Sequence, residues 1–183
     1  AALVYRGNYT GISVACSNSS FSIIRNNTVS NISWSNQEEG EIFTGIKLAG
    51  GKIDCYNNTI GSQTQRSKIL STSTYPNHAY LYGISVNPPT EQSRQDTFLV
   101  RRNSIGGVKL QRDATNYAET YFSCIYGKVN RSYLSIANNI LGSLTVPGSI
   151  ESVIQGEEFK GVYVVVNDTL GQPNSANPLK FYV

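Results

Sequence analysis

The chain has 183 residues and a formal net charge of +3, with 15% charged and 39% hydrophobic residues. The small net charge and the regular recurrence of apolar residues exclude a disordered chain, and scattered basic residues exclude the footprint of a nucleic-acid-binding protein. No apolar run is long enough to span a membrane, so we expect no membrane insertion. Few charges with abundant Asn, Ser, Thr, Gly and Tyr are typical of extracellular β proteins. We expect one domain over residues 1–183, as a segment of a larger exported protein.

The first repeated pattern along the chain is an aromatic or leucine residue, a variable residue, Gly, and then Ile or Val, with an apolar residue two positions later. Its central position is held by Gly11, Gly45, Gly83, Cys124 and Gly161, which are 34, 38, 41 and 37 residues apart. Alternation with a period of two predicts strands, and the glycine predicts a bend at the start of each strand. A fixed pattern at such intervals predicts a solenoid.

A second pattern, apolar-x-apolar-x-x-Asn-x-apolar-Gly, follows the first in four units. Its asparagine is Asn27, Asn58, Asn103 and Asn139. We predict that this asparagine turns the chain near left-handed helical geometry, and that the four side chains form a hydrogen-bonded ladder from coil to coil. The residue before this asparagine is Arg102 in the third unit, and a buried ladder would not accept an arginine. We therefore take the second residue of each pair, and not the first, as the ladder residue.

Each unit therefore predicts three short strands separated by bends, with a long loop leading to the next unit. The long loops cover residues 31–42, 62–80, 107–121 and 143–158. Apolar residues at equivalent positions should stack in columns inside the coils. The expected columns are Ile12/Ile46/Ile84/Ile125/Val162, Val14/Leu48/Val86/Val164, Ile53/Phe98/Leu134, Ile24/Cys55/Val100/Ile136 and Val29/Ile60/Ile105/Leu141.

The fifth unit departs from this scheme. An imitation of the asparagine pattern over residues 167–171 follows Gly161 too early. The fifth coil is either abbreviated, or residues 179–183 are the second strand of a coil that the chain does not complete. We favour the second interpretation.

Three cysteines, Cys16, Cys55 and Cys124, lack the spacing of metal ligands. We expect free thiols that behave as small hydrophobic residues, with a Cys16–Cys55 disulfide as the alternative.

The Gly-Ile-x-Val and Asn-x-Ile-Gly patterns resemble the repeats of the pectate-lyase-like superfamily, and residues 56–62 look like repeats of large secreted surface proteins of Bacteroidetes. The resemblance covers residues 9 to about 170. It implies an all-β fold, a right-handed parallel β-helix of about four to five coils, in a secreted or cell-surface protein of a Gram-negative bacterium. The fold hosts lyases, hydrolases, adhesins and tailspikes, so the resemblance transfers no catalytic residue.

Catalytic chemistry has little support in the sequence. The hydrolase patterns Asn-Thr-Asp, Asp-Asp, Gly-His-Gly and Arg-Ile-Lys of the superfamily do not occur. Asp54 should share an outward strand face with Arg25 and Arg101, which is the one arrangement suited to a lyase, although a solvated ion cluster explains it as well. The acidic residues near 38–41 and 157–158 and the single histidine, His78, give no metal site or catalytic triad, and we expect no cofactor.

Tyrosines are the stronger candidates for binding. Tyr126 and Tyr163 should point outward in line with Lys47, and Tyr82 should lie in a loop at one edge with Tyr75, Tyr80, Tyr117 and Tyr121. Aromatic rings on a flat sheet can hold the apolar faces of sugars. Lys47, Tyr82, Tyr126 and Tyr163 are therefore the candidate ligand-binding residues. The alternative is that the tyrosines pack the long loops onto the sheet.

These observations favour a non-catalytic module of an adhesin-like protein, with glycans or neighbouring domains of the same protein as partners. The alternative is a polysaccharide lyase or glycoside hydrolase acting on acidic polysaccharide. A tailspike-like trimer is a third possibility, disfavoured by the short chain.

Overall fold

The computed structural model describes residues 8–36, 40–65, 69–73, 79–88, 96–112, 120–129, 132–143, 145–152 and 158–166. All regular structure in these residues is β-strand. The described part of the chain has no helix that is long and apolar enough to cross a membrane. The first two coils contain β1 (Tyr9–Ala15), β2 (Ser22–Arg25), β3 (Thr28–Val29), β4 (Ile32–Asn36), β5 (Gly40–Gly50), β6 (Lys52–Tyr56), β7 (Thr59–Gly61) and β8 (Ile69–Ser73). The later coils contain β9 (Ala79–Val86), β10 (Thr97–Arg101), β11 (Ser104–Gly106), β12 (Val108–Arg112), β13 (Thr120–Val129), β14 (Tyr133–Ala137), β15 (Ile140–Leu141), β16 (Ile150–Ser152) and β17 (Glu158–Val166).

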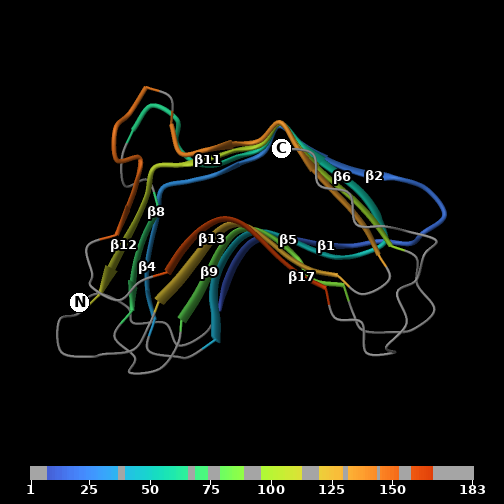
Figure 1. Ribbon diagram of the computed structural model, residues 1–183, viewed down its shortest axis with the longest axis horizontal. Helices are drawn as coiled ribbons and strands as arrows, with labels where there is room; N and C mark the ends of the chain where they lie inside the picture. Colours follow the sequence, from blue (N-terminus) through green and yellow to red (C-terminus); the bar gives the residue numbers. More distant parts are fainter. Residues whose placement is uncertain are drawn as a thin grey trace.

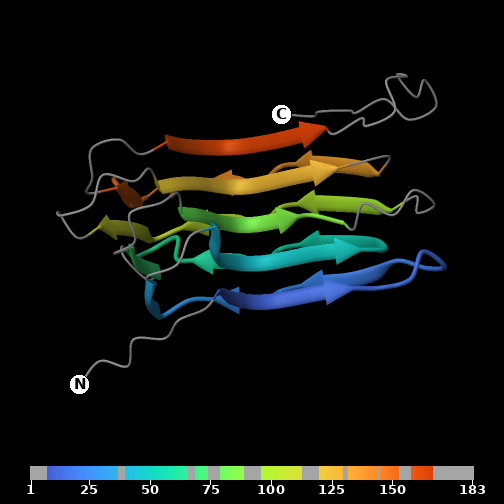
Figure 2. The ribbon, with the colours of Figure 1, turned by 90° about the horizontal axis from the view of Figure 1, so that it is seen from below.

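The strands form four parallel sheets, so the fold is a parallel β-helix. The first sheet has the order β1-β5-β9-β13-β17, and the second, third and fourth contain the second, third and fourth strands of each coil. Figure 2 shows the coils stacked from the N-terminal to the C-terminal end. In Figure 1 the chain runs counterclockwise through the sheets while it advances towards the viewer, which makes the β-helix right-handed. Right-handed crossovers are the rule between parallel strands.

The predicted core columns are confirmed by the strand register. Ile12, Ile46, Ile84, Ile125 and Val162 are successive partners in the first sheet. The columns of the second and third sheets follow the same rule, because each inward position meets its equivalent in the next coil. The central members of these columns are fully buried, whereas Val162 at the C-terminal end is 44% exposed. Burial of apolar side chains against the equivalent side chains of the next coil therefore holds the coils together.

The number of strands per coil differs from the sequence-based expectation. Each of the four predicted long loops contains a strand of the fourth sheet, so a coil has four strands and not three. Ile32 and Val108 begin these strands five residues after their ladder asparagines, whereas Ile69 and Ile150 follow theirs by eleven. Because this spacing changes from coil to coil, a fixed-offset pattern does not reveal the fourth strand. Residues 62–65 and 145–149 belong to these longer connections and project at the upper left of Figure 1.

The asparagine ladder is confirmed. The backbone N–H of Asn27 donates to Oδ1 of Asn58 at 3.0 Å, that of Asn58 to Oδ1 of Asn103 at 3.0 Å, and that of Asn103 to Oδ1 of Asn139 at 2.9 Å. The side-chain amides link the same residues, with Nδ2 to Oδ1 distances of 2.9 to 3.0 Å. The ladder thus satisfies backbone N–H groups that the bend removes from the sheets.

The predicted role of this asparagine in turning the chain is wrong. The left-handed residue is the one before it, with φ of 57° at Asn26, 54° at Asn57, 54° at Arg102 and 55° at Asn138. Turning the chain and forming the ladder are therefore the work of two different residues. The left-handed residue faces solvent, where an arginine side chain is tolerated. The inward position belongs to the asparagine whose amide spans two coils.

The three cysteines are free, so the alternative of a Cys16–Cys55 disulfide is wrong. Cys55 and Cys124 are buried, and Cys16 is partly buried with its thiol donating to the carbonyl oxygens of Gly50 and Lys52. The interpretation of residues 167–171 and 179–183 as parts of a fifth coil lies outside the described residues.

Alkaline pH should weaken the fold through the buried thiols. Burial raises the pKa of Cys55 and of Cys124 from 9.0 to about 12. In the unfolded chain the thiols ionise first, so their contribution is complete below pH 9.0 and is lost as the pH rises from 9.0 towards 12. We expect the free energy of unfolding, measured with urea, to fall across this range. The fall should be smaller in the Cys55→Val/Cys124→Gly variant, and an identical slope would contradict the assignment.

Candidate functional site

Asp54, Arg25 and Arg101 lie on the outer face of the second sheet but do not form one cluster. Arg101 makes a bidentate pair with Asp54, at 2.9 Å from Nε to Oδ1 and 2.6 Å from Nη2 to Oδ2. Its guanidinium also lies 4.6 Å from the centre of the Tyr56 ring. Arg25 donates to the Tyr56 hydroxyl at 3.1 Å. Because both oxygens of Asp54 are engaged, this carboxylate is poorly suited to act as a base or to bind calcium.

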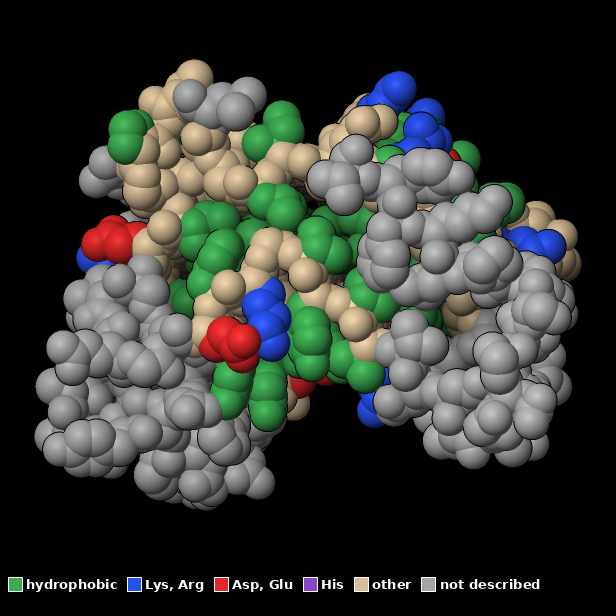
Figure 3. Space-filling model, in the orientation of Figure 1, with side chains coloured by type: hydrophobic (Ala, Val, Ile, Leu, Met, Phe, Trp, Pro, Cys, Tyr) green, Lys and Arg blue, Asp and Glu red, His purple; other side chains and the backbone are tan. Residues whose placement is uncertain are grey.

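The other carboxylates of the described residues also have partners. No group of three or more His, Cys, Asp or Glu side chains in this part of the chain is arranged to hold a metal ion. Figure 3 shows acidic side chains beside basic ones on the described surface and not gathered into an acidic patch. The remaining contacts are Glu41–Lys47 at 3.2 Å, Lys109–Glu151 at 3.6 Å, Lys160–Glu158 at 3.1 Å, and the buried Asp96 carboxylate accepting from the Gly51 N–H at 3.0 Å.

The four candidate binding residues, Lys47, Tyr82, Tyr126 and Tyr163, share the outer face of the first sheet, which we call the tyrosine face. The register places Lys47, Ser85, Tyr126 and Tyr163 in one column, as predicted. Tyr82 lies in strand β9 and not in a loop, because the strands of the first sheet begin several residues before the bend glycine. Tyr80 and Tyr121 are likewise in strands, whereas Tyr75 and Tyr117 lie outside the described residues.

The rings of the tyrosine face cover one another. Tyr82 and Tyr126 are stacked with centroids 4.4 Å apart and planes 10° apart, and Tyr163 follows at 5.9 Å with a tilt of 42°. The Lys160 ammonium lies 3.8 Å from the centre of the Tyr163 ring. The ring faces are therefore largely occupied, which removes the expected stacking of sugars on Tyr126. Tyr126 and Tyr163 offer ring edges and hydroxyl groups to a ligand, whereas Tyr82 is only 8% exposed and mainly supports the stack.

The chemistry of these hydroxyls is that of neutral hydrogen-bonding groups. Burial raises the pKa of Tyr82 well above its ordinary value, with neighbouring Tyr126 and Glu41 adding to the effect. Burial and neighbouring Tyr163 raise the pKa of Tyr126. No described residue hydrogen-bonds to the hydroxyls of Tyr82, Tyr126 or Tyr163. The hydroxyls of Tyr82 and Tyr126 therefore stay protonated at neutral pH, and a tyrosine hydroxyl can both donate and accept a hydrogen bond.

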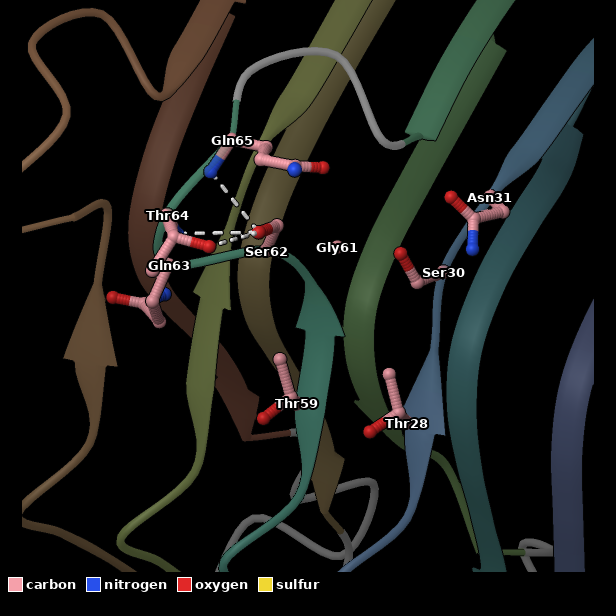
Figure 4. A pocket seen from close by; sticks show the side chains of 9 residues that line it. All are labelled: Thr28, Ser30, Asn31, Thr59, Gly61, Ser62, Gln63, Thr64 and Gln65. Carbon is pink, nitrogen blue, oxygen red and sulfur yellow. Dashed lines mark hydrogen bonds between the residues drawn. The ribbon is translucent and has the colours of Figure 1, made fainter.

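A feature that the sequence analysis missed is a polar pocket between the third strands of the first two coils and the loop after β7. Its volume is about 380 Å³. Figure 4 shows Gln65 pointing towards Ser30 and Asn31 from the opposite wall. The lining residues are Thr28, Ser30, Asn31, Thr59, Gly61, Ser62, Gln63, Thr64 and Gln65.

This pocket follows from the unequal corners of the first two coils. The first coil enters its fourth strand at once through Asn31, whose φ is 60°, while the second inserts the loop that begins at Ser62. Because the connection through Asn31 is short and the loop that begins at Ser62 is longer, the two coils do not stack closely here, and the pocket lies between them. The unequal spacing between ladder asparagine and fourth strand is the signal in the sequence that could have predicted it.

Comparison with known proteins does not identify the chain: no protein-family model, curated protein or solved structure matches it. The fold itself agrees with the expected parallel β-helix. Membership of the pectate-lyase-like superfamily and the likeness to surface proteins of Bacteroidetes stay predictions.

Proposed function

We propose that this β-helix is a non-catalytic module of a secreted or cell-surface adhesin-like protein, and that it holds glycans along the tyrosine face. The observation that carries the proposal is the row of Tyr82, Tyr126 and Tyr163 beside Lys47 on one sheet face. Lys47, Tyr126 and Tyr163 lie in one column parallel to the axis of the β-helix, and the Tyr82 ring stacks diagonally on Tyr126. A glycan chain has hydroxyls spaced along its length and can contact such a line at several points.

The engagement of the described carboxylates supports a binding role over catalysis. Hydrolysis of a glycosidic bond requires two carboxyl groups facing the bond, and calcium-assisted lyases require clustered acidic ligands. Asp54 is paired with Arg101 and Glu41 with Lys47. In each case the cation that neutralises the carboxylate comes from the same sheet.

Hydrogen bonding by tyrosine hydroxyls is the contact we propose for the tyrosine face. Tyr163 is 39% exposed, and the Lys47 side chain is 31% exposed next to Glu41. The hydroxyls are unused within the described residues, whereas the ring faces are stacked. A lysine–glutamate pair adds one donor and one acceptor group without a strong net charge, which suits a hydroxyl-rich ligand.

Removal of two hydroxyls should weaken glycan binding while preserving the fold. We expect the Tyr126→Phe/Tyr163→Phe variant to bind the strongest ligand of a glycan array about tenfold more weakly, because each lost hydrogen bond is worth ~0.5–1.5 kcal/mol. Its thermal midpoint should be unchanged, since the ring stack remains. Titration calorimetry against that glycan measures the effect, and Tyr133→Phe on the outer face of the second sheet is the matched control.

Three results would count against the proposal. Absence of binding to every glycan on the array would remove the ligand class. Formation of unsaturated product from polygalacturonate or alginate, followed by absorbance, would show catalysis and favour the polysaccharide lyase. If the phenylalanine variant binds as well as the unaltered chain, hydroxyl contact at this face is wrong.

A further inference from the structure

The polar pocket gathers polar side chains that have no partner among the described residues. The side chains of Thr28, Ser30, Asn31, Thr59 and Gln65 make no hydrogen bond with any of them. By contrast, the side chains of the asparagine ladder and of the Arg101–Asp54 pair are engaged in contacts between coils. The volume of the hollow is within the range of small-molecule sites, and these polar side chains are available to contact a ligand in it.

The pocket has an apolar floor and a polar rim. Figure 4 shows the methyl groups of Thr28 and Thr59 side by side, directed towards the side on which Ser30 and Gly61 lie. The two threonines are register partners in the third sheet, so their methyl groups form a small continuous apolar surface. Above it stand the hydroxyl of Ser30 and the amides of Asn31 and Gln65. A sugar ring has the same division, with C–H groups on one face and hydroxyls around its edge.

The lining selects for an uncharged ligand. No Lys, Arg, His, Asp or Glu is among the lining residues. An anion would lose hydration without gaining a cation, and a divalent cation would find amide and hydroxyl oxygens but no carboxylate. Amide and hydroxyl groups supply both donors and acceptors, which neutral hydroxyls require.

Recognition of a peptide backbone is disfavoured at this place. An added peptide strand needs unpaired N–H and C=O groups at a sheet edge. Strand β7 pairs with β3 on one side and with β11 on the other, and the Thr59 N–H donates to the Asn27 carbonyl oxygen at 2.8 Å. The backbone groups between β3 and β7, where the pocket lies, are therefore already paired, and side-chain groups make the contacts that we propose.

One wall of the pocket is held in position before any ligand arrives. The Ser62 hydroxyl accepts hydrogen bonds from the N–H groups of Thr64 and Gln65, both at 3.1 Å. The carbonyl oxygen of Gln63 accepts from the hydroxyls of Ser143 and Thr145, at 2.5 Å and 3.3 Å. The loop of the second coil is thus tied to the loop of the fourth. A fixed wall lowers the entropy lost on binding.

We propose that the polar pocket binds one ring of an uncharged saccharide, with the Thr28 and Thr59 methyl groups under the ring and with Ser30, Asn31 and Gln65 on its hydroxyls. This site lies on the third sheet and is independent of the tyrosine face on the first. The proposal therefore goes beyond the proposed function and does not depend on it.

The test is a nuclear magnetic resonance titration of the isotope-labelled chain with methyl glycosides of glucose, galactose, mannose and N-acetylglucosamine. We expect saturable shifts of the backbone amides of residues 28–31 and 59–65 with at least one neutral glycoside. Asn31→Gly and Gln65→Ala should each weaken that binding about three- to tenfold, as expected for one lost hydrogen bond. Asn31→Gly keeps the left-handed turn, because glycine adopts it freely and Gly107 occupies the corresponding place before β12 with a φ of 63°.

The matched control is Asn138→Gly, which makes the same change at another exposed left-handed turn, with φ of 55°, away from the pocket. Its affinity should equal that of the unaltered chain. Three results would overturn the proposal: no saturable shift with any neutral glycoside, equal binding of galacturonate or of a short uncharged peptide, or retention of the shifts in the Asn31→Gly/Gln65→Ala variant. The Tyr126→Phe/Tyr163→Phe variant should leave the shifts unchanged, so failure of one site is distinguishable from failure of the other.

Discussion

Replacement of Gly61 by alanine should destabilise the chain by about 3–5 kcal/mol, or prevent folding altogether. Two costs add at this position. Gly61 has a φ of 79°, which costs a residue with a side chain ~1–2 kcal/mol. The added Cβ would also overlap the carbonyl oxygen of Gly106 in the next coil, which accepts a hydrogen bond from the Ser62 N–H at 2.7 Å. Backbone cannot move aside as a flexible side chain can, so the two coils must separate locally.

Gly142 provides the matched control, because it holds the same place in the pattern of the fourth coil. Its φ of 96° is also left-handed, but the nearest atom to an added Cβ is the Ser149 hydroxyl oxygen at 3.6 Å, an ordinary contact. Gly142→Ala should therefore cost only ~1–2 kcal/mol, from backbone conformation alone. Urea unfolding of both variants at constant m-value gives the comparison. Equal losses would show that the steric contact between coils is unimportant.

The repeated core could be predicted because interior positions of a solenoid impose the same requirement in every coil. Ile60 and Ile105 are register partners and fully buried, and each follows its ladder asparagine by two residues. The chain enters each asparagine turn in the same way, so the spacing is constant and the columns can be read from the sequence. The strands of the fourth sheet could not be predicted in this way, because Ile32 and Ile69 follow their ladder asparagines at different distances.

The candidate sites depend on arrangements that the repeat does not encode. Tyr126 and Tyr163 share a column, which period-two alternation predicts. The closer stack of Tyr126 with Tyr82 is diagonal, because the register partners of these two rings are the small residues Ser85 and Ser123. The small serine side chains leave space for each tyrosine ring to contact the other diagonally across the two strands. This contact depends on side-chain packing, which the spacing of residues in the sequence does not reveal. The polar pocket likewise arises from a difference between neighbouring coils.

Truncation of the asparagine at the centre of the ladder should be nearly as damaging as Gly61→Ala. Asn103 is fully buried, and its Oδ1 accepts from the Asn58 backbone N–H at 3.0 Å and from the Asn58 Nδ2 at 2.9 Å. Its own Nδ2 donates to the Cys55 carbonyl oxygen and to Asn139 Oδ1, both at 3.0 Å. Asn103→Ala leaves the buried Asn58 N–H without its acceptor and removes one hydrogen bond each from the Cys55 carbonyl oxygen, Asn58 Nδ2 and Asn139 Oδ1. The expected loss is about 3–5 kcal/mol, because each buried unsatisfied group costs ~1–3 kcal/mol.

The same substitution at the end of the ladder should have a much smaller effect. Asn27 donates to Arg25 and to Asn58, but its Oδ1 accepts no hydrogen bond from another described residue. Its removal leaves no buried N–H unpaired, so Asn27→Ala should cost about 1 kcal/mol or less. Urea unfolding of the two variants therefore separates the value of an asparagine that bridges two coils from that of one that ends the row. A similar loss in both would mean that the ladder contributes little beyond local turn geometry, and that the apolar columns alone hold the coils in register.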